Sequence, residues 1–270
     1  MQTELQRLIS VGDVSAAREL LVCAVRDDPD SPWARWLLFE IYLVCGTWER
    51  ALAHLTTLRA LDPSRLPTYE AYFQVTEALL VREAVWRGEQ APKCQDQSWL
   101  VWERRMELIR KAHAGDEMAA RSLAELATSS PPVQGRCDAA PFDGWEDWDG
   151  RFRFGLEVII DGEYCWLQWT EIRRFDLAGT GQRLRDLVVR PVMLTLLGQH
   201  PRPAFLPVRY PGTDESNDAA LLLGKETRMR GSHGSARGVG THLFRAGPSP
   251  ARELPLTGFK TIEFAAPPTA

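Results

Sequence analysis

Residues 12–18 read Gly-Asp-Val-Ser-Ala-Ala-Arg, and residues 46–51 read Gly-Thr-Trp-Glu-Arg-Ala. The second stretch begins 34 residues after the first, and an Asp-Pro pair at 28–29 returns at 62–63 with the same separation. Apolar residues between these points recur at spacings of three and four, which is typical of helices with one buried face. A helical pattern with this period indicates the helix–turn–helix unit of the tetratricopeptide repeat.

The residues at the repeated positions suit the turns and contacts of such a unit. Gly12 and Gly46 stand where the first helix ends, a position that often requires the left-handed backbone conformation. Ala17 and Ala51 fall on the second helix, where a small side chain lets two helices approach closely. Each Asp-Pro pair ends the second helix, because the residue before a proline is disfavoured in the α-helical region. Two unrelated helical hairpins are the alternative interpretation.

The repeat pattern weakens after residue 65 but does not stop. A third unit begins at Leu66, although Leu80 and Val85 stand in its second helix where glycine and alanine are expected. Residues 115–121 read Gly-Asp-Glu-Met-Ala-Ala-Arg and resemble residues 12–18. We therefore predict a degenerate repeat domain over residues 1–127, with a loop near 88–97 and a further helix over 99–114.

The second half of the chain changes composition and then period. Residues 128–150 contain a Ser-Ser-Pro-Pro run and an acidic, aromatic stretch, and we expect them to form a linker. Two runs of β-forming residues at 156–160 and 163–169 flank Asp161-Gly162, the strongest short hairpin signal. Further expected elements are strands at 172–177, 192–197, 204–208 and 260–264, and a helix at 219–228. The prediction is an α+β chain of two domains: a tetratricopeptide-like α–α superhelix, then a mainly antiparallel β domain over 151–270 with a disordered tail after about 264.

Composition excludes several classes of function. The net charge is −4 and neither half is basic, which argues against binding nucleic acid through its phosphates. No apolar run approaches the ~18–20 residues that span a bilayer, and the first residues do not resemble a secretory signal. Five cysteines without a CxxC motif are typical of reduced cytosolic thiols. We expect a cytoplasmic protein that binds neither nucleic acid nor membrane.

Motifs for catalysis or metal binding are weak. Five histidines are scattered, and His233 and His242 share a loop without a cysteine or acidic pair nearby to complete a metal site. The glycine-rich stretch at 231–240 lacks the Lys-Ser/Thr of a phosphate-binding loop, so a flexible surface loop is the better interpretation. No GxSxG motif occurs. We predict no catalytic residues, no metal and no cofactor.

Tetratricopeptide arrays present the first helices of their units on a concave surface that suits a helix or an extended peptide. In the second unit this surface carries tryptophans beside a carboxylate, and in the third unit it carries polar and acidic residues. The predicted groove residues are Trp33, Trp36, Glu40 and Leu43, with Glu70, Gln74 and Glu77. Such a groove fits an amphipathic helix with basic edges. The alternative is that Trp33 and Trp36 pack against neighbouring helices or the other domain.

Several of these stretches occur together, and in the same order, in one known family. They are residues 46–51 with Leu61-Asp62-Pro63, residues 156–162 with Tyr164 and Trp166, residues 185–188, and residues 208–212. Together they resemble the ImpE family, also called TagJ, an accessory component of some bacterial type VI secretion systems. Thr241 and His242 depart from the family pattern, which more usually has glutamine and arginine there.

The resemblance implies a non-enzymatic cytoplasmic adaptor. Its expected partner is the N-terminal helix of TssB, the small sheath subunit, with an indirect link to the ClpV-type ATPase that recycles the contracted sheath. The family does not identify the binding surface, so the groove follows from the residues alone. Two other functions stay open on the sequence: a general repeat scaffold or chaperone for a different client, and a metal-dependent hydrolase that uses His233 or His242 of the C-terminal domain.

Overall fold

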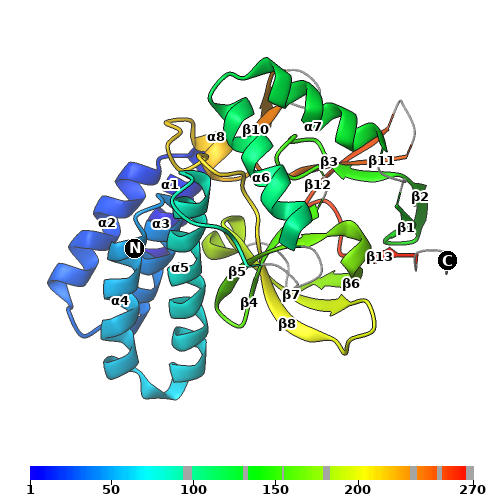
Figure 1. Cartoon of the computed structure of the whole chain (residues 1–270). Helices are drawn as coiled ribbons and strands as arrows, with labels where there is room; N and C mark the ends of the chain where they lie inside the picture. The colour runs from blue at the N-terminus through cyan, green and yellow to red at the C-terminus, as the bar shows by residue number, and fades with distance from the viewer. Residues whose placement is uncertain are drawn as a thin grey trace.

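The computed structural model describes residues 1–93, 99–129, 133–153, 155–178, 183–231, 236–247 and 251–265. Its helical half lies beside a β-rich half, and two further helices cross above the β half (Figure 1). None of the described helices combines the length and the apolar character needed to cross a bilayer.

Two helical hairpins stand where the 34-residue period places them. They consist of α1 (Gln2–Val11) with α2 (Val14–Asp27), and α3 (Pro32–Val44) with α4 (Trp48–Leu61). Gly12 and Gly46 end α1 and α3 with φ values of 83° and 65°, the left-handed conformation expected of both. Ala17 and Ala51 are completely buried, which explains why a small residue recurs at this position.

The third predicted unit differs from the first two. After a short 3-10 turn, η1 (Pro63–Arg65), α5 runs without a break over Leu66–Trp86. Leu80 lies where a glycine would have ended the first helix, and a leucine simply continues it. The predicted helix hairpin of this unit is therefore wrong, and one long helix replaces it.

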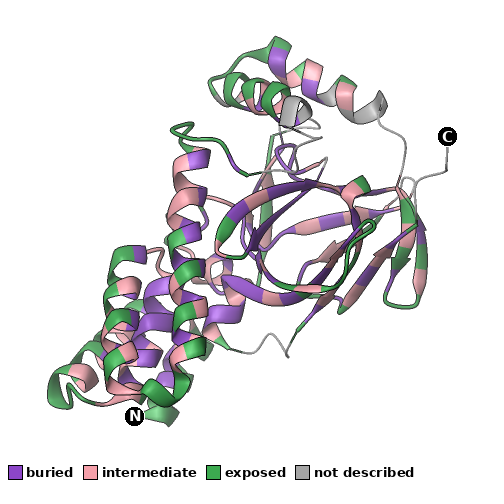
Figure 2. Ribbon diagram, turned by 60° about the horizontal axis from the view of Figure 1, so that its bottom comes forward, coloured by how far each residue is buried: buried purple, intermediate pink, exposed green. Residues whose placement is uncertain are grey.

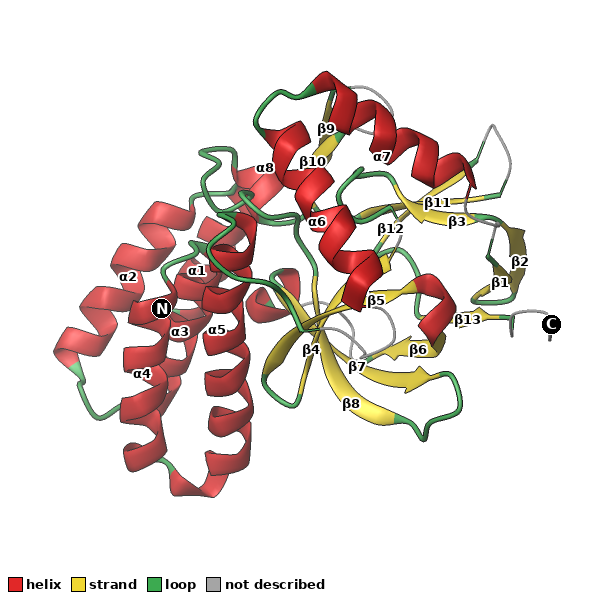
Figure 3. Ribbon diagram, viewed as in Figure 1, coloured by secondary structure: helices red, strands yellow, loops and turns green. Residues whose placement is uncertain are grey.

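The last two helices form a hairpin of their own, α6 (Trp99–His113) with α7 (Glu117–Ser129). Gly115 turns the chain with φ 91°, and the Asp116 carboxylate accepts the amide of Ala119 at 3.1 Å, much as Asp13 accepts the amide of Ala16 at 2.9 Å. The local resemblance to residues 12–18 is therefore real. However, α6 and α7 lie over the β half and not in line with α1–α5, so the repeat array ends at α5 (Figure 3).

The β half is antiparallel in every named strand pair, as predicted. Its largest sheet has the strand order β2-β1-β13-β6-β7-β8-β4-β5, and smaller sheets have the orders β12-β11-β3 and β10-β9. The strands are β1 (Gln134–Cys137), β2 (Ala140–Asp143), β3 (Trp145–Asp147), β4 (Gly155–Ile160), β5 (Glu163–Gln168), β6 (Ile172–Leu177), β7 (Val189–Leu196), β8 (Arg202–Pro207), β9 (Thr227–Arg230), β10 (Arg237–Gly240), β11 (Leu243–Ala246), β12 (Arg252–Pro255) and β13 (Thr261–Phe264). Short helices are η2 (Trp169–Glu171), η3 (Leu184–Leu187) and α8 (Ala219–Leu222).

The hairpin at Asp161-Gly162 forms as predicted. Both turn residues have positive φ, 51° and 79°, which matches the right-handed twist of the flanking strands β4 and β5. The strands expected at 172–177, 192–197, 204–208 and 260–264 correspond to β6, β7, β8 and β13 within a few residues.

Three expectations for this half were wrong or incomplete. Residues 128–150 are not a linker, because β1 and β2 extend the large sheet and β3 joins a smaller one. The helix expected over 219–228 shortens to α8, and β9 follows it. Of the glycine-rich stretch at 231–240, residues 237–240 form β10, which pairs with β9. Residues 232–235 lie outside the described residues, as do residues 266–270 of the expected disordered tail.

The two halves share one hydrophobic core. All six residues of β4 are buried because its alternate side chains enter different cores. Val158 and Ile160 point into a core within the β half, whereas Ile159 joins the core that also holds Trp36 and Tyr72 of the helical half. Figure 2 shows buried residues both among the helices and along the strands of the β half.

Candidate functional site

The groove predicted on the concave face of the repeats is closed by the chain itself. Trp36, Glu40 and Leu43 are buried, and η3 of the β half packs against α3. Arg185 of η3 forms an ion pair with Glu40, donates to the Tyr72 hydroxyl at 2.8 Å, and lies over the Trp36 ring at 5.1 Å. The prediction of an open groove at these three residues is therefore wrong, and the alternative of packing against the other domain holds for Trp36.

The other predicted groove residues do not form one surface with those three. Trp33 is 42% exposed at the start of α3, and Glu70 pairs with Arg59 on the surface. Gln74 is exposed beside the β4–β5 turn, and Glu77 is exposed on α5.

A buried ionic network links α5 to the β half. Arg82 of α5 makes two hydrogen bonds to the Glu157 carboxylate, at 2.7 and 2.6 Å. His242 lies between two carboxylates, with its Nδ1 2.6 Å from Asp147 and its Nε2 2.9 Å from Glu157. Tyr210 donates its hydroxyl to Asp147 at 2.6 Å, so the network joins α5, β3, β4, the loop after β8 and the residue before β11.

The pKa values of His242 and Glu157 shift so as to favour their charged forms, whereas burial raises the pKa of Asp147. Burial alone would lower the pKa of His242, but the carboxylates of Asp147 and Glu157 outweigh it and raise that pKa to about 9. Burial would raise the pKa of Glu157, but the Arg82 guanidinium outweighs it and lowers that pKa to about 2. His242 is therefore a cation at neutral pH.

This geometry argues against the metal-dependent hydrolase. Both ring nitrogens of His242 are already hydrogen-bonded, so neither has a lone pair free for a metal or for a substrate proton. His233 lies outside the described residues. Within the described ranges, the side chains form no group of three or more His, Cys, Asp or Glu residues suited to holding a metal ion.

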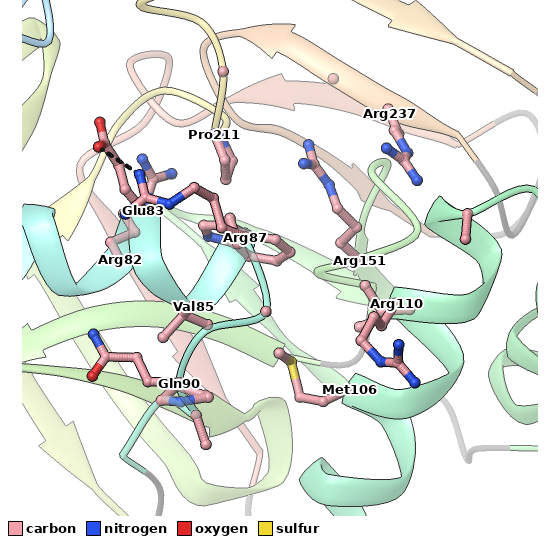
Figure 4. Close-up of a pocket in the computed structure, with 18 of the residues that line it drawn as sticks. Arg82, Glu83, Val85, Arg87, Gln90, Met106, Arg110, Arg151, Pro211 and Arg237 are labelled. Carbon is pink, nitrogen blue, oxygen red and sulfur yellow. Dashed lines mark ion pairs between the residues drawn. The ribbon is translucent and has the colours of Figure 1, made fainter.

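A large cleft opens on the other side of Arg82, between the end of α5, α6, the turn after Tyr210 and the β9–β10 ribbon. Its volume is about 1580 Å³, above the range of roughly 300–1,000 Å³ typical of small-molecule sites. Its apolar lining comes mainly from the helices and includes Trp48, Val85, Trp86, Trp102, Met106 and Ile109. Figure 4 shows side chains from these elements converging on the cavity. The size and lining fit a segment of another protein better than a metabolite.

Two hydrogen-bond donors in this lining lack acceptors. The indole N–H groups of Trp86 and Trp102 are buried and have no hydrogen-bond partner among the residues that the structure describes. An unsatisfied buried donor costs about 1–3 kcal/mol, and neither of these N–H groups is exposed to the cleft.

Charged residues of both signs line the cleft, and the Arg110 guanidinium pairs with the Glu107 carboxylate of the same helix at 2.9 Å. Arg110 of α6, Arg151 of the loop after β3, and Arg237 of β10 lie on one side of the cavity, and Arg82, Glu83 and Arg87 of the end of α5 lie on the other (Figure 4). Arg230 lies on the same side as Arg237, because the two residues stand opposite each other on the neighbouring strands β9 and β10. Sequence analysis missed this site. Its residues come from segments more than 100 positions apart, and the glycine-rich stretch is the one of these segments that carries a recognisable sequence motif.

The comparisons first define the class of protein. A tetratricopeptide repeat profile matches residues 8–71, which cover the end of α1, all of α2 to α4 and the start of α5. The profile described as ImpE protein matches residues 139–263, from the end of the β1–β2 turn into β13. The chain is therefore a tetratricopeptide-repeat protein with an ImpE-type β domain.

A relative of known role makes the assignment specific. The type VI secretion system accessory component TagJ of Pseudomonas aeruginosa is 33% identical over 242 residues, which cover 88% of this chain and 84% of that protein. This chain belongs to the ImpE family, as its sequence motifs indicated. A crystal structure of a Vibrio parahaemolyticus protein shares the fold, with a TM-score of 0.85, 19% identity and 97% of each chain covered.

Proposed function

We propose that this chain is a non-enzymatic cytoplasmic adaptor of a type VI secretion system. In this proposal it binds the N-terminal helix of the small sheath subunit, TssB, and assists sheath assembly or ClpV-linked recycling. Membership of the family that contains TagJ supports the secretion-system role. The engagement of both nitrogens of His242, the one histidine of the rival hydrolase interpretation that the structure describes, supports an absence of catalysis.

The cleft between α5, α6 and the β9–β10 ribbon carries the binding proposal. The concave groove is filled by η3, so a partner helix needs another apolar surface. The cleft offers one, with the half-buried Met106 and the rings of Trp86 and Trp102 in its lining. An amphipathic helix in an apolar groove is a recurrent mode of recognition, and adaptable methionine and rigid tryptophan side chains are suited to it.

A matched pair of methionine variants tests this placement. Met106→Glu puts a charge into the cleft, whereas Met118→Glu puts the same charge on the exposed face of α7, outside the cleft lining. Both are titrated with a synthetic peptide of the sheath-subunit N-terminal helix by calorimetry, after circular dichroism has verified folding. We expect Met106→Glu to weaken the affinity for the peptide by roughly tenfold or more, and Met118→Glu to leave it unchanged. Equal affinity in the two variants would move the helix site elsewhere.

A further inference from the structure

We infer that one wall of the cleft is movable: the α6–α7 hairpin swings outward to admit the partner helix, while α5 and the β9–β10 ribbon stay in place. This inference rests on the proposed function, which supplies the partner, and concerns how that partner enters. The walls of the cleft differ in how they are attached to the rest of the chain.

The α5 wall is fixed to the β half by buried, charge-assisted hydrogen bonds. Arg82 donates two of them to the Glu157 carboxylate, at 2.7 and 2.6 Å, and a third to the carbonyl oxygen of Arg209 at 2.7 Å. Arg82 and Glu157 are both buried, so breaking their contact would leave a charge without its partner away from water. α5 therefore does not separate readily from the sheet.

The ribbon wall is fixed in a similar way. The completely buried Asp149 carboxylate accepts the Arg151 side chain at 2.6 Å and the amide of Gly238 at 2.7 Å. The Thr213 hydroxyl accepts the amide of Gly240 at 2.9 Å. One edge of β10 is thus bonded to β9 and the other edge to these two side chains, which holds the ribbon in position.

The α6–α7 wall is attached mainly by apolar contact. Among the described elements, α6 and α7 pack chiefly on each other. Trp102 connects α6 to the β half: its ring lies edge-on to Trp166 at 5.1 Å and stands 2.9 Å from where a Cβ on Gly155 would be. Arg110 pairs within the hairpin, with Glu107 of the same helix at 2.9 Å. Apolar contacts of this kind are not directional, unlike the hydrogen bonds that hold the other two walls.

The closed position of this wall carries a cost that opening removes. Trp102 is 2% exposed, and its indole N–H has no acceptor among the residues that the structure describes. Burial also lowers the pKa of Arg105 of α6 to about 10, so the closed position disfavours that charge. Both groups regain water when α6 swings out. Opening is therefore opposed by less than the apolar contact alone would require.

An opening motion is needed because α5 and α6 meet beside the cleft. A Cβ on Gly88, just after α5, would lie 3.7 Å from the Cδ of Arg110, which is van der Waals contact. Both residues line the cleft. A helix with its side chains is ~10–12 Å across, so it cannot pass between them unless the walls separate. The wall with the weaker attachment is the one that moves.

Hydrogen exchange of the full chain without a partner tests the unequal attachment. α5 and α6 are both long helices that line the same cleft, so α5 is the internal reference. We expect the amides of α6 and α7 to exchange at least about tenfold faster than those of residues 75–82 in α5. Equal protection of the two helices would overturn the inference, whether or not any partner binds.

Two matched tryptophan variants locate the attachment. Trp86 of α5 and Trp102 of α6 contact the same Trp166 ring, each at 5.1 Å. We expect Trp102→Ala to speed exchange in α6 and α7 by a further tenfold, roughly, and to leave residues 75–82 unchanged. Trp86→Ala should also leave residues 75–82 unchanged, because Arg82 still holds α5. Circular dichroism verifies that both variants fold. Equal changes in α5 and α6 on either substitution would mean that the walls move as one unit, against the inference.

The sheath-helix peptide, a synthetic copy of the sheath-subunit N-terminal helix, tests entry into the cleft. We expect saturating peptide to slow exchange in α6 and α7 by at least about tenfold and to change residues 75–82 far less, because the bound helix holds the movable wall. A peptide that binds by calorimetry without slowing exchange in α6 would overturn the inference and leave the adaptor function standing. Failure of the peptide to bind would overturn the proposed function and this mode of entry with it.

Discussion

Arg185 of the β half pairs with Glu40 of the helical half across 145 residues of sequence. The pair lies in the concave face of the repeats, where such proteins otherwise receive partners, and a ring contact with Trp36 and a hydrogen bond to Tyr72 complete it. The β half is therefore the occupant of the repeat groove. This arrangement fills the groove from within the chain, so the proposed partner helix requires another surface.

Removing one side of this pair should be costly. Arg185→Ala leaves the Glu40 carboxylate buried without its cation, and losing one partner of a buried ion pair typically costs about 3–5 kcal/mol. We expect a loss of that order in the free energy of unfolding, measured by urea denaturation. Arg174→Ala, which removes a surface arginine from its pair with Asp176, is the control and should change little. A comparable loss in both variants would contradict the buried role of Arg185.

Stability should fall at alkaline pH because of His242. Its pKa in the folded chain, about 9, lies above the ordinary 6.5, so the folded state holds a proton that the unfolded state releases. The stabilisation is complete below about pH 6.5 and is lost as the pH rises through about 9, at roughly 1.4 kcal/mol per pH unit. Denaturation curves between about pH 6 and pH 10 measure this slope. His242→Gln should be less stable at neutral pH and should lack this part of the slope; an unchanged slope would refute the assignment to His242.

Two glycines that end helices should differ in their tolerance of alanine. Gly46 and Gly115 both have left-handed φ, so alanine at either costs about 1–2 kcal/mol in backbone strain. A Cβ on Gly46 would also stand 2.6 Å from the Cβ of Asp214, whereas one on Gly115 would meet nothing within 4 Å. We expect Gly46→Ala to lower the unfolding free energy by about 1–3 kcal/mol more than Gly115→Ala, by chemical denaturation. Equal losses would mean that the loop at Asp214 yields freely.

The tryptophans of the predicted groove should affect stability and not recognition. Trp36→Ala removes a buried ring that contacts Phe39, Tyr69 and Tyr72, and should cost about 3–5 kcal/mol. Trp33→Ala removes a half-exposed ring and should cost far less. We expect Trp33→Ala to bind the sheath-helix peptide with unchanged affinity in calorimetric titration. A tenfold loss in that variant would return the binding site to the repeats.

The sequence by itself determined the features that depend on near neighbours. The 34-residue period located four helices and both glycine turns, and Asp161-Gly162 located the β4–β5 hairpin, because these signals lie within a few residues of the structure they specify. The hairpin predicted for the third unit is wrong for a local reason too, because Leu80 supplies no signal to end a helix and α5 continues through it.

Only the tertiary structure decided what each surface contacts. Residues 128–150 have the composition of a linker, but β1 pairs with β13 at the far end of the chain, and no local pattern indicates this pairing. Glu40 was predicted to line the groove, but Arg185, which pairs with it and buries it, comes from the other half of the chain. The cleft likewise joins α5 and α6 to the β9–β10 ribbon. Periodicity shows which face of an element is apolar, but burial against a distant segment depends on the packing of the whole chain, which no local pattern carries.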